Sequence, residues 1–316
     1  MRFVIVGPGA LGCLLGAKLA EAVTRTDDVL WILDHDPKRA DLIHRKGILY
    51  EKFDRQKRYP VNACADPKVI GRADVLFLCV KSYAVKATLE FCRPLLFQPR
   101  TLLIFMQNGI GHLDFQDQVG EAAVAFGCTS EGATSLGAGH VRHAGDGTTF
   151  LGFLDQPDET FQALLAKTVS VLQAGRLSVS VSENIRTRLW AKLFVNVGIN
   201  ALTAIHDCMN GELLTIPRAG EEMREAVREA EQVAVAKGIP IENDPYQATV
   251  AVCKATARNI SSMRQDVLKN RPTEIDAING AVVKEALCLK IPTPVNDSLV
   301  RRIKEIENNY GTQRTR

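Results

Sequence analysis

The sequence predicts an α/β fold in two domains: a doubly wound parallel sheet over residues 1–180, followed by an all-helical domain over residues 181–316. Two observations lead to this prediction. In the first half, short continuous apolar runs alternate with segments of helical spacing, which is the pattern of a parallel sheet covered by helices on both faces. After Ser182 almost every segment has helical periodicity. A chain of 316 residues can bury a separate core in each domain.

Continuous apolar runs locate the strands of the first domain. They are RFVIV (2–6), VLWIL (29–33), VLFLCV (75–80) and TLLIFM (101–106). From about residue 122, closely spaced glycines and short apolar runs predict a meander that completes the same sheet. A helix at about 158–174 and a strand at 177–181 then lead out of the domain. The helices expected beyond it cover residues 183–206, 217–237, 245–257, 274–289 and 296–309.

The composition indicates a small-molecule partner. A net charge of +3 without a long Lys/Arg block gives no electrostatic footprint for nucleic acid or a membrane surface. The eight cysteines form no C-x-x-C pair and no His, Asp and Glu cluster has ligand spacing, so we expect reduced thiols and no metal. No signal-peptide pattern and no uncharged run of about 18 residues is visible, so we expect a cytoplasmic protein. The helical domain could supply a homodimer surface.

The motif GPGALG directly follows the first strand and opens a helix. Gly7 permits a tight turn, Gly9 lets the backbone approach a pyrophosphate, and Gly12 allows close helix packing. The helix N-terminus, with Ala10 and Leu11, offers free N–H groups and a positive dipole end to phosphates. In this strand-to-helix context the motif predicts a dinucleotide cofactor, NAD(P)H.

The end of the second strand bears on which dinucleotide is used. Asp34 lies 22 residues beyond Gly12, where a carboxylate can bind the ribose hydroxyls of NAD and repel a 2′-phosphate. Lys38 or Arg39 could instead curl back to a 2′-phosphate, or simply occupy the exposed first turn of the next helix. The local sequence therefore favours NADH and leaves NADPH open.

Two further polar residues follow predicted parallel strands. Lys81 comes after VLFLCV, and Asn108 lies in QNGIG at a Gly-rich strand exit near the expected nicotinamide. Lys81 could contact the cofactor or be a lysine that extends from the strand end into solvent. Asn108 could bind cofactor and substrate or serve only as a turn residue before Gly109.

The helical segment LWAKLFVNVGINALTAI (189–205) places Lys192, Asn196 and Asn200 on one face. An ordinary amphipathic helix is one explanation, but a solvated face usually carries Glu, Lys and Arg, and Asn is a poor helix former. A buried lysine is costly unless its charge is used. Hydride transfer to a ketone builds negative charge on the carbonyl oxygen, and a positioned ammonium both stabilises that charge and gives up a proton.

Five segments together resemble the ketopantoate reductase (2-dehydropantoate 2-reductase) family. They are GPGALG, QNGIG, NIRTRLWAKLFVNVGINALTAI, NGEL (210–213) and ARNISSMRQDV with PTEIDAINGAVV (257–283). The match in order and spacing runs from end to end. The resemblance implies a Rossmann-type domain, an all-helical domain, and NAD(P)H-dependent reduction of ketopantoate to (R)-pantoate, a step of pantothenate and coenzyme A biosynthesis, in the cleft between the domains.

The resemblance also implies a role for each matched residue. Lys192 would be the general acid, Glu274 would bind the substrate hydroxyl and help orient the site, and Asn108 would sit between cofactor and substrate. The residues that would hold the substrate are Asn196, Asn200, Asn259 and Ser262. No metal is implied.

Local sequence offers structural alternatives for some of these residues. Glu274 could be a favourable acid in a helix first turn with Thr273 as N-cap, and Ser262 could open a capping box with Gln265. The family commonly has a basic residue near the end of its second strand, where this chain has Asp34. A paralogous reductase of another 2-oxo acid is the main alternative function. A non-catalytic dinucleotide sensor is less consistent with the presence of Lys192.

Overall fold

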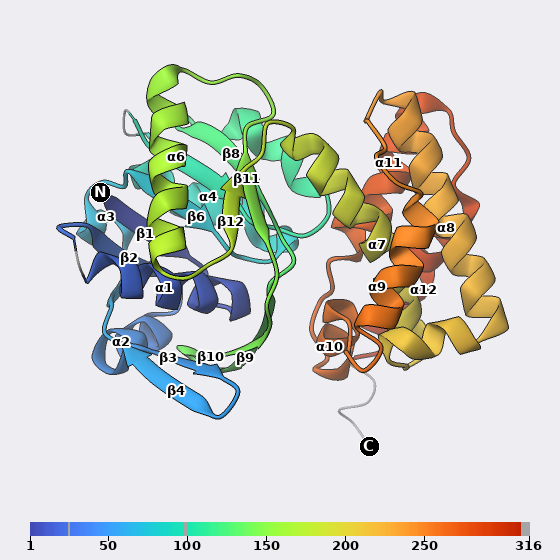
Figure 1. The fold of residues 1–316 in the computed structure, drawn as a ribbon, viewed down its shortest axis with the longest axis horizontal. Helices are drawn as coiled ribbons and strands as arrows, with labels where there is room; N and C mark the ends of the chain where they lie inside the picture. The colour runs from blue at the N-terminus through green and yellow to red at the C-terminus, as the bar shows by residue number, and fades with distance from the viewer. Residues whose placement is uncertain (25, 98–99, 311–316) are drawn as a thin grey trace. The chain divides into compact units, whose positions relative to one another are not determined.

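The computed structural model describes residues 1–24, 26–97 and 100–310 (Figure 1). The chain forms two compact units. The first consists of residues 1–107 and 112–185, and the second of residues 108–111 and 186–316. The chain thus leaves the first unit after Ile185, a little beyond the expected boundary near residue 180. Each unit is described separately below.

The first unit is built on an eight-stranded sheet with the order β12-β11-β8-β7-β6-β1-β2-β5. All neighbouring strands are parallel except β8 and β11. The predicted doubly wound sheet is therefore confirmed, because β1 lies between β2 and β6 and the chain runs outward in both directions from it. The strands are β1 (Arg2–Val6), β2 (Val29–Leu33), β5 (Asn62–Cys64), β6 (Val75–Leu78), β7 (Leu102–Phe105), β8 (Ala123–Thr129), β11 (Thr149–Gly152) and β12 (Val179–Val181).

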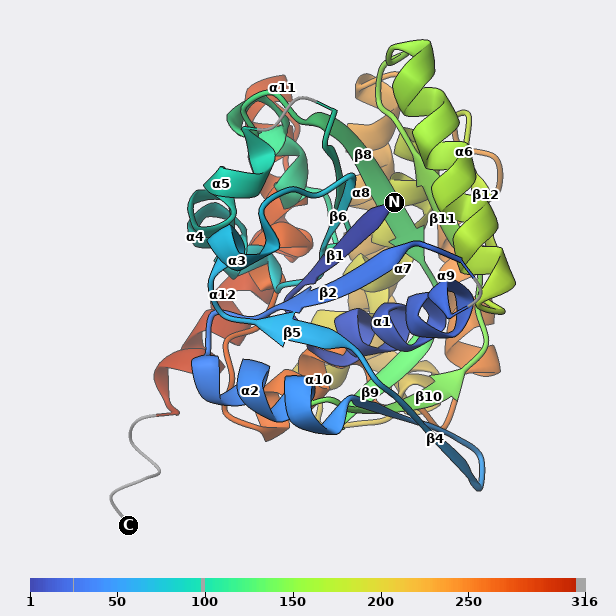
Figure 2. The same ribbon diagram turned by 90° about the vertical axis from the view of Figure 1, so that its left-hand side faces the viewer.

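Helices cover both faces of this sheet. Figure 2 shows α4 and α5 on one side and α1 and α6 on the other, and α1 packs directly against α6. Aspartate side chains cap three of the helices: Asp36 at the start of α2, Asp66 at the start of α3 and Asp158 at the start of α6. The helices are α1 (Ala10–Val23), α2 (Pro37–Lys46), α3 (Pro67–Ile70), α4 (Val85–Phe91), α5 (Arg93–Leu96) and α6 (Glu159–Ala174), with 3₁₀ turns η1 (Ser82–Ala84) and η2 (Gly111–Gln118).

A second, four-stranded sheet with the order β4-β3-β10-β9 corrects one prediction. The meander was expected to complete the main sheet, but only β8 and β11 join it. Strands β9 and β10 form a hairpin, and β10 pairs in parallel with β3 instead. The reason is burial, because Ile48, Tyr59 and Val141 of this sheet pack into the core beside α1. The strands are β3 (Ile48–Lys52), β4 (Arg55–Tyr59), β9 (Gly132–Gly137) and β10 (His140–Gly145).

The second unit is helical, as predicted. Two details differ from the expectation. Residues 262–268 form an additional helix, and the helix expected over 274–289 is broken because Ile278 has a non-helical backbone (φ −105°, ψ −92°). No helix among the described residues has both the length and the hydropathy to cross a membrane. The helices are α7 (Ile185–Ile205), α8 (Pro217–Ala236), α9 (Pro245–Ala255), α10 (Ser262–Leu268), α11 (Asn279–Leu289) and α12 (Pro294–Asn308), with 3₁₀ turns η3 (Asn210–Thr215) and η4 (Ile275–Ala277).

Candidate active site

A chain of hydrogen bonds in the second unit joins three of the predicted site residues. Lys192 Nζ donates to Asn108 Oδ1 at 2.8 Å, and Asn108 Nδ2 donates to Glu274 Oε2 at 3.1 Å. Lys192 and Asn108 are half-buried, while Glu274 is only 5% exposed. The arrangement places an ammonium donor and a carboxylate acceptor on either side of one amide. Together these groups can bind a polar ligand, and the ammonium can protonate it.

The backbone of the loop Asn108–Gly111 explains how Asn108 reaches this position. Ile110 N donates to Ala277 O at 3.1 Å, so the loop is fixed to the η4 turn that directly follows Glu274. Gly109 has a φ of +75°, and a Cβ there would lie 1.9 Å from Ala277 O. Only glycine allows both the left-handed conformation and this close approach.

Glu274 lies at the start of a turn, as the structural alternative required, but its side chain does not cap that turn. It occupies the N-cap position of η4, but its side chain makes no cap hydrogen bond and is bonded to Asn108 instead. Thr273, the expected N-cap, accepts a hydrogen bond from Ile275 N at 3.3 Å within the turn. The carboxylate of Glu274 therefore bonds to the amide of Asn108 rather than capping its own turn.

Helix α7 carries Lys192, Asn196 and Asn200 at successive turns. The Nδ2 group of Asn196 is buried and finds no hydrogen-bond partner among the described residues. Asn200 is 6% exposed. A buried amide donor without a partner is unusual in a folded protein and indicates a ligand contact or a bound water. Arg188 lies one turn before Lys192 on the same face of α7, but it is exposed and its guanidinium lies 3.7 Å from Glu242.

The structure places Asn259 and Ser262 on either side of a serine that the sequence analysis did not select. Ser261, not Ser262, is the N-cap of α10, and its Oγ accepts from Arg264 N at 3.2 Å. The same Oγ lies 2.7 Å from Thr203 Oγ1, one turn beyond Asn200 on α7. Ser262 and Asn259 are exposed. This segment is therefore attached to α7 through Ser261.

The capping box considered as an alternative role for Ser262 and Gln265 is not formed. Gln265 Nε2 donates to Ile260 O at 2.9 Å, and the cap is supplied by the preceding serine. Adjacent serines have the same capping propensity, so the sequence alone could not distinguish them. The side chain of Ser262 is thereby left at the surface, where it can contact a ligand.

The Gly-rich loop of the first unit has the geometry that a dinucleotide pyrophosphate requires. Gly7 has a φ of +86°, and a Cβ there would lie 2.6 Å from Val80 Cγ1. A Cβ on Gly12 would lie 2.2 Å from Gly7 O, whereas one on Gly9 would project into open space. Gly9 is the N-cap of α1 and no side chain caps this helix, so its first N–H groups, including those of Ala10 and Leu11, fit a phosphate.

Gln107 links the strand ends beside this loop. Its Nε2 donates to Leu78 O at 2.8 Å and to Val80 O at 3.0 Å, and the side chain is 4% exposed. Val80 in turn lies against Gly7. Lys81 follows immediately, half-buried at the N-cap position of η1. Sequence analysis named Lys81 but missed Gln107, whose position before Asn108 in QNGIG was the available signal.

Asp34 is engaged by Arg39 in a way that neither reading of the sequence anticipated. Arg39 donates to both oxygens of Asp34, from Nε at 2.7 Å and from Nη2 at 2.6 Å. Asp36 N also donates to Asp34 Oδ1 at 3.1 Å. Asp34 is 1% exposed, whereas the Arg39 side chain is 45% exposed. The hydrogen bonds to Asp34 raise the pKa of the Arg39 guanidinium, and this guanidinium is the more accessible charge at the end of β2.

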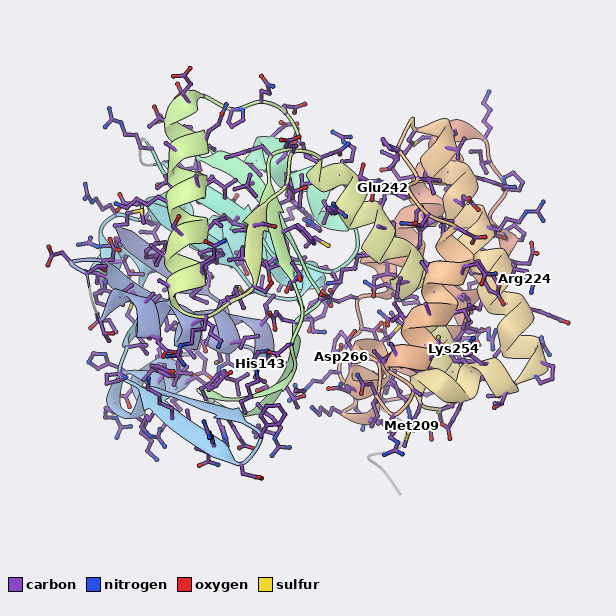
Figure 3. All side chains as sticks on the ribbon, in the orientation of Figure 1. His143, Met209, Arg224, Glu242, Lys254 and Asp266 are labelled. Carbon is purple, nitrogen blue, oxygen red and sulfur yellow. The ribbon has the colours of Figure 1, made fainter. Side chains whose placement is uncertain are left out.

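A group of potential metal ligands corrects the expectation that no such cluster exists. Glu131, His143 and Asp146 each bring a ligand atom within 4.8 Å of the others (His143 is labelled in Figure 3). His143 Nε2 lies 2.6 Å from Glu131 Oε2, and Tyr50 Oη lies 2.8 Å from His143 Nδ1. Lys52 Nζ donates to Asp146 Oδ1 at 2.5 Å, so a protein cation already balances that carboxylate.

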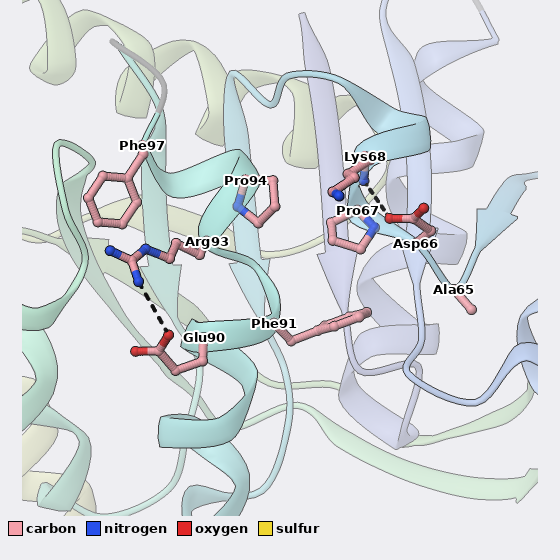
Figure 4. Close-up of a pocket in the computed structure, with 9 residues that line it drawn as sticks. All are labelled: Ala65, Asp66, Pro67, Lys68, Glu90, Phe91, Arg93, Pro94 and Phe97. Atoms are coloured by element: carbon pink, nitrogen blue, oxygen red, sulfur yellow. Dashed lines mark hydrogen bonds and ion pairs between the residues drawn. The ribbon is translucent and has the colours of Figure 1, made fainter.

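A pocket of about 550 Å³ on the first unit contains none of the predicted site residues (Figure 4). Its walls include Pro67, Phe91, Pro94 and Phe97. At its rim, Arg93 Nη1 lies 3.9 Å from Glu90 Oε2.

Comparisons with known proteins agree with the resemblance in the sequence. The family model described as ketopantoate reductase PanE/ApbA matches residues 3–156, and its C-terminal counterpart matches residues 184–307. A 2-dehydropantoate 2-reductase of Halobacterium salinarum is 33% identical over 310 residues, which are 96% of this chain and 98% of that protein.

Solved structures share the fold. The structure of a PanE/ApbA family ketopantoate reductase from Ralstonia eutropha JMP134 has a TM-score of 0.88 and 29% identity, covering 98% of this chain and 100% of that one. D-mandelate dehydrogenase, solved with NADH and anilino(oxo)acetate, has a TM-score of 0.88 at 24% identity and covers 98% and 99% of the two chains. On this evidence the chain belongs to the ketopantoate reductase family.

Proposed function

We propose that this protein catalyses the NAD(P)H-dependent reduction of 2-dehydropantoate to (R)-pantoate, with Lys192 as the general acid. This reaction is a step of pantothenate and coenzyme A biosynthesis. The hydrogen-bonded chain from Lys192 through Asn108 to Glu274 carries this proposal. Family membership supplies the reaction class, and the residue types in this chain match what ketone reduction needs.

The chemistry follows from charge development on the substrate carbonyl. The reduced nicotinamide supplies the hydride when the dinucleotide is bound. As the carbonyl oxygen becomes negative, the Lys192 ammonium stabilises it and donates the proton that completes the alcohol. Asn108 Oδ1 holds the ammonium in place, and Glu274 fixes the amide so that its oxygen faces the lysine.

The remaining polar residues of the second unit are proposed to hold the substrate. Glu274 accepts a hydrogen bond from the substrate hydroxyl, because an ionised carboxylate is an acceptor only. The buried Nδ2 of Asn196, which has no partner among the described residues, donates to the substrate carboxylate. Asn200, Asn259 and Ser262 complete the set. Neutral amides and hydroxyls bind the anion without adding charge near the lysine.

The dinucleotide is proposed to bind at the Gly-rich loop of the first unit. The residues that would hold it are Gly7, Gly9, Ala10, Leu11, Gly12, Lys81 and Asn108. We further propose that both NADH and NADPH are used. Asp34 favours NADH as the sequence suggests, but Arg39 neutralises it and presents an exposed guanidinium that can contact a 2′-phosphate.

The reaction is tested by the initial rate of dinucleotide oxidation with 2-dehydropantoate and a panel of other 2-oxo acids, each with NADH and NADPH. The highest kcat/KM is expected for 2-dehydropantoate. Turnover confined to another 2-oxo acid would keep the chemistry but identify a paralogous reductase. Dinucleotide binding without turnover of any 2-oxo acid would identify a sensor and refute the proposal.

The dinucleotide preference has its own test. Arg39→Ala should raise the Kd for NADPH about tenfold or more and leave the Kd for NADH within about twofold, since one charge-assisted contact to phosphate is lost. Lys38→Ala is the matched control, because Lys38 is its exposed neighbour in the first turn of α2. An equal loss of NADPH affinity in both variants, or no loss in either, would mean that Arg39 does not bind the 2′-phosphate.

A further inference from the structure

A buried carboxylate on α8 holds the start of α12 in the second unit. Glu229 is 6% exposed and accepts three hydrogen bonds: from Val295 N at 2.8 Å, from Asn296 N at 2.9 Å, and from Asn296 Nδ2 at 2.7 Å. Thr293, the N-cap of α12, makes no side-chain cap bond. Glu229 therefore caps α12 from a neighbouring helix, where the dipole also favours a negative charge.

The same network extends to the helix that carries Lys192. The Oδ1 of Asn296 accepts from Asn279 Nδ2 at 3.0 Å, and Asn279 Nδ2 also donates to Val197 O at 3.3 Å. Asn279 and Asn296 are both fully buried. A continuous line of hydrogen bonds therefore runs from Glu229 to the backbone of α7 at the residue next to Asn196.

Asn279 connects the two segments whose relative placement matters for the reaction. It begins α11 shortly after Glu274, and its partner Val197 lies on α7 between Lys192 and Asn200. Asn108 joins Lys192 to Glu274 through side chains, whereas Asn279 joins the same two segments through the backbone of α7.

Close packing limits how α7 can shift if this connection is lost. At Gly198, next to Val197, a Cβ would lie 2.8 Å from Thr249 Cγ2 and 2.9 Å from Val227 Cγ2. The helix is thus already in contact with α8 and α9 at this point. A small displacement of α7 would change its side-chain contacts with α8 and α9, because close-packed interiors have few alternative arrangements.

We propose that Asn279 is a positioning residue for the reduction, which together with Asn296 and Glu229 fixes α7 so that Lys192 and Asn196 are correctly placed relative to Glu274. The inference rests on the proposed function. Asn279 Oδ1 has no partner among the described residues, so the donor half of the amide carries the connection. Misplacement of a reacting group by about 1 Å can cost about a hundredfold in rate.

The test compares three variants in the full-length protein. Asn279→Ala should lower kcat about 10- to 100-fold while the Kd for dinucleotide stays within about twofold. Glu229→Gln, which keeps the shape and weakens the network at its far end, should give a smaller loss of kcat. Glu222→Gln is the matched control, because Glu222 also links α8 to α12, through Arg302 Nη1 at 3.0 Å, without reaching Val197. It should leave kcat unchanged.

Two kinetic outcomes would overturn the inference. One is a normal kcat for Asn279→Ala, assayed well below its melting temperature, since a purely structural residue would lower Tm alone. The other is an equal loss of kcat in Glu222→Gln and Glu229→Gln. Hydrogen exchange of the amides of Val197–Ala201 gives a readout independent of substrate. Faster exchange in Asn279→Ala but not in Glu222→Gln is expected even if the reaction assigned to the site is wrong, and unchanged exchange would refute the positioning role.

Discussion

Asn108 and Glu274 are 166 residues apart in sequence and share a hydrogen bond of 3.1 Å. The direction of this bond is fixed by chemistry. An ionised carboxylate only accepts and an ammonium only donates, so the Asn108 amide must turn its NH₂ to Glu274 and its oxygen to Lys192. The amide therefore lies between the ammonium of Lys192 and the carboxylate of Glu274 and contacts both.

Loss of the lysine should remove the proton donor without unfolding the protein. Lys192→Ala is expected to lower kcat about 10²- to 10⁴-fold, in the range of general acid catalysis, with dinucleotide Kd and Tm close to those of the wild type. Steady-state rates across a range of pH, with a dinucleotide titration, provide the measurement. Arg188→Ala removes an exposed cation from the same helix and should have little effect. A near-normal rate for Lys192→Ala at every pH would refute the assignment.

Substitutions of Glu274 should act mainly on substrate binding. Glu274→Ala leaves the Asn108 Nδ2 donor without its acceptor and removes the proposed partner of the substrate hydroxyl. A lost hydrogen bond to a charged group is worth about 1.5–3 kcal/mol, so KM for the 2-oxo acid should rise about tenfold or more, with some loss of kcat. Glu274→Gln retains an acceptor oxygen, so its KM should lie between those of the wild type and Glu274→Ala. An unchanged KM in both variants would show that Glu274 does not contact substrate.

A pair of glycine substitutions tests the attachment of the loop to η4. Gly109→Ala combines a φ of +75° with a Cβ 1.9 Å from Ala277 O, so it should lower stability by more than about 1 kcal/mol and reduce kcat by displacing Asn108. Gly220→Ala, inside α8 where a Cβ meets nothing within 4 Å, should raise stability by about 0.5–1 kcal/mol. The measurement is the Tm of both variants in thermal unfolding, which should fall for Gly109→Ala and rise for Gly220→Ala. Similar Tm shifts of the same sign would contradict the argument.

Removal of the charge on Asp34 should release Arg39. Asp34→Asn keeps the size of the side chain but withdraws the carboxylate that both Nε and Nη2 of Arg39 contact. The ratio of kcat/KM for NADPH to that for NADH is expected to rise, because the ribose acceptor of NADH weakens while the guanidinium becomes free for a 2′-phosphate. An unchanged ratio would assign the preference to other residues.

The strands of the main sheet were readable because strands buried on both faces are continuous apolar runs. The ranges 2–6 and 29–33 are reproduced residue for residue in β1 and β2. Strand β4 was missed because its sequence RQKRY is exposed at every position except Tyr59. A strand with so little burial has almost no hydrophobic periodicity to detect.

Partnerships within the candidate site were less accessible to sequence reasoning than its residue types. Helical spacing alone placed Lys192 and Asn196 on one face. Nothing local could pair Asn108 with Glu274, and the family resemblance implied a role for each residue without implying the hydrogen bond between them. The role of Ser261 depends on its 2.7 Å contact with Thr203, a tertiary interaction that two adjacent serines in a sequence do not reveal.

The grouping of Asn108–Gly111 with residues 186–316 means that the helical unit is made from two separate pieces of chain. A recombinant fragment starting at Arg186 would contain Lys192 and Glu274 but lack the amide that joins them, and Ala277 O would lose its donor. The helical unit is therefore not a portable module. A chimera that transplants these helices onto another dinucleotide-binding scaffold must also graft the Asn108–Gly111 tetrapeptide into the host.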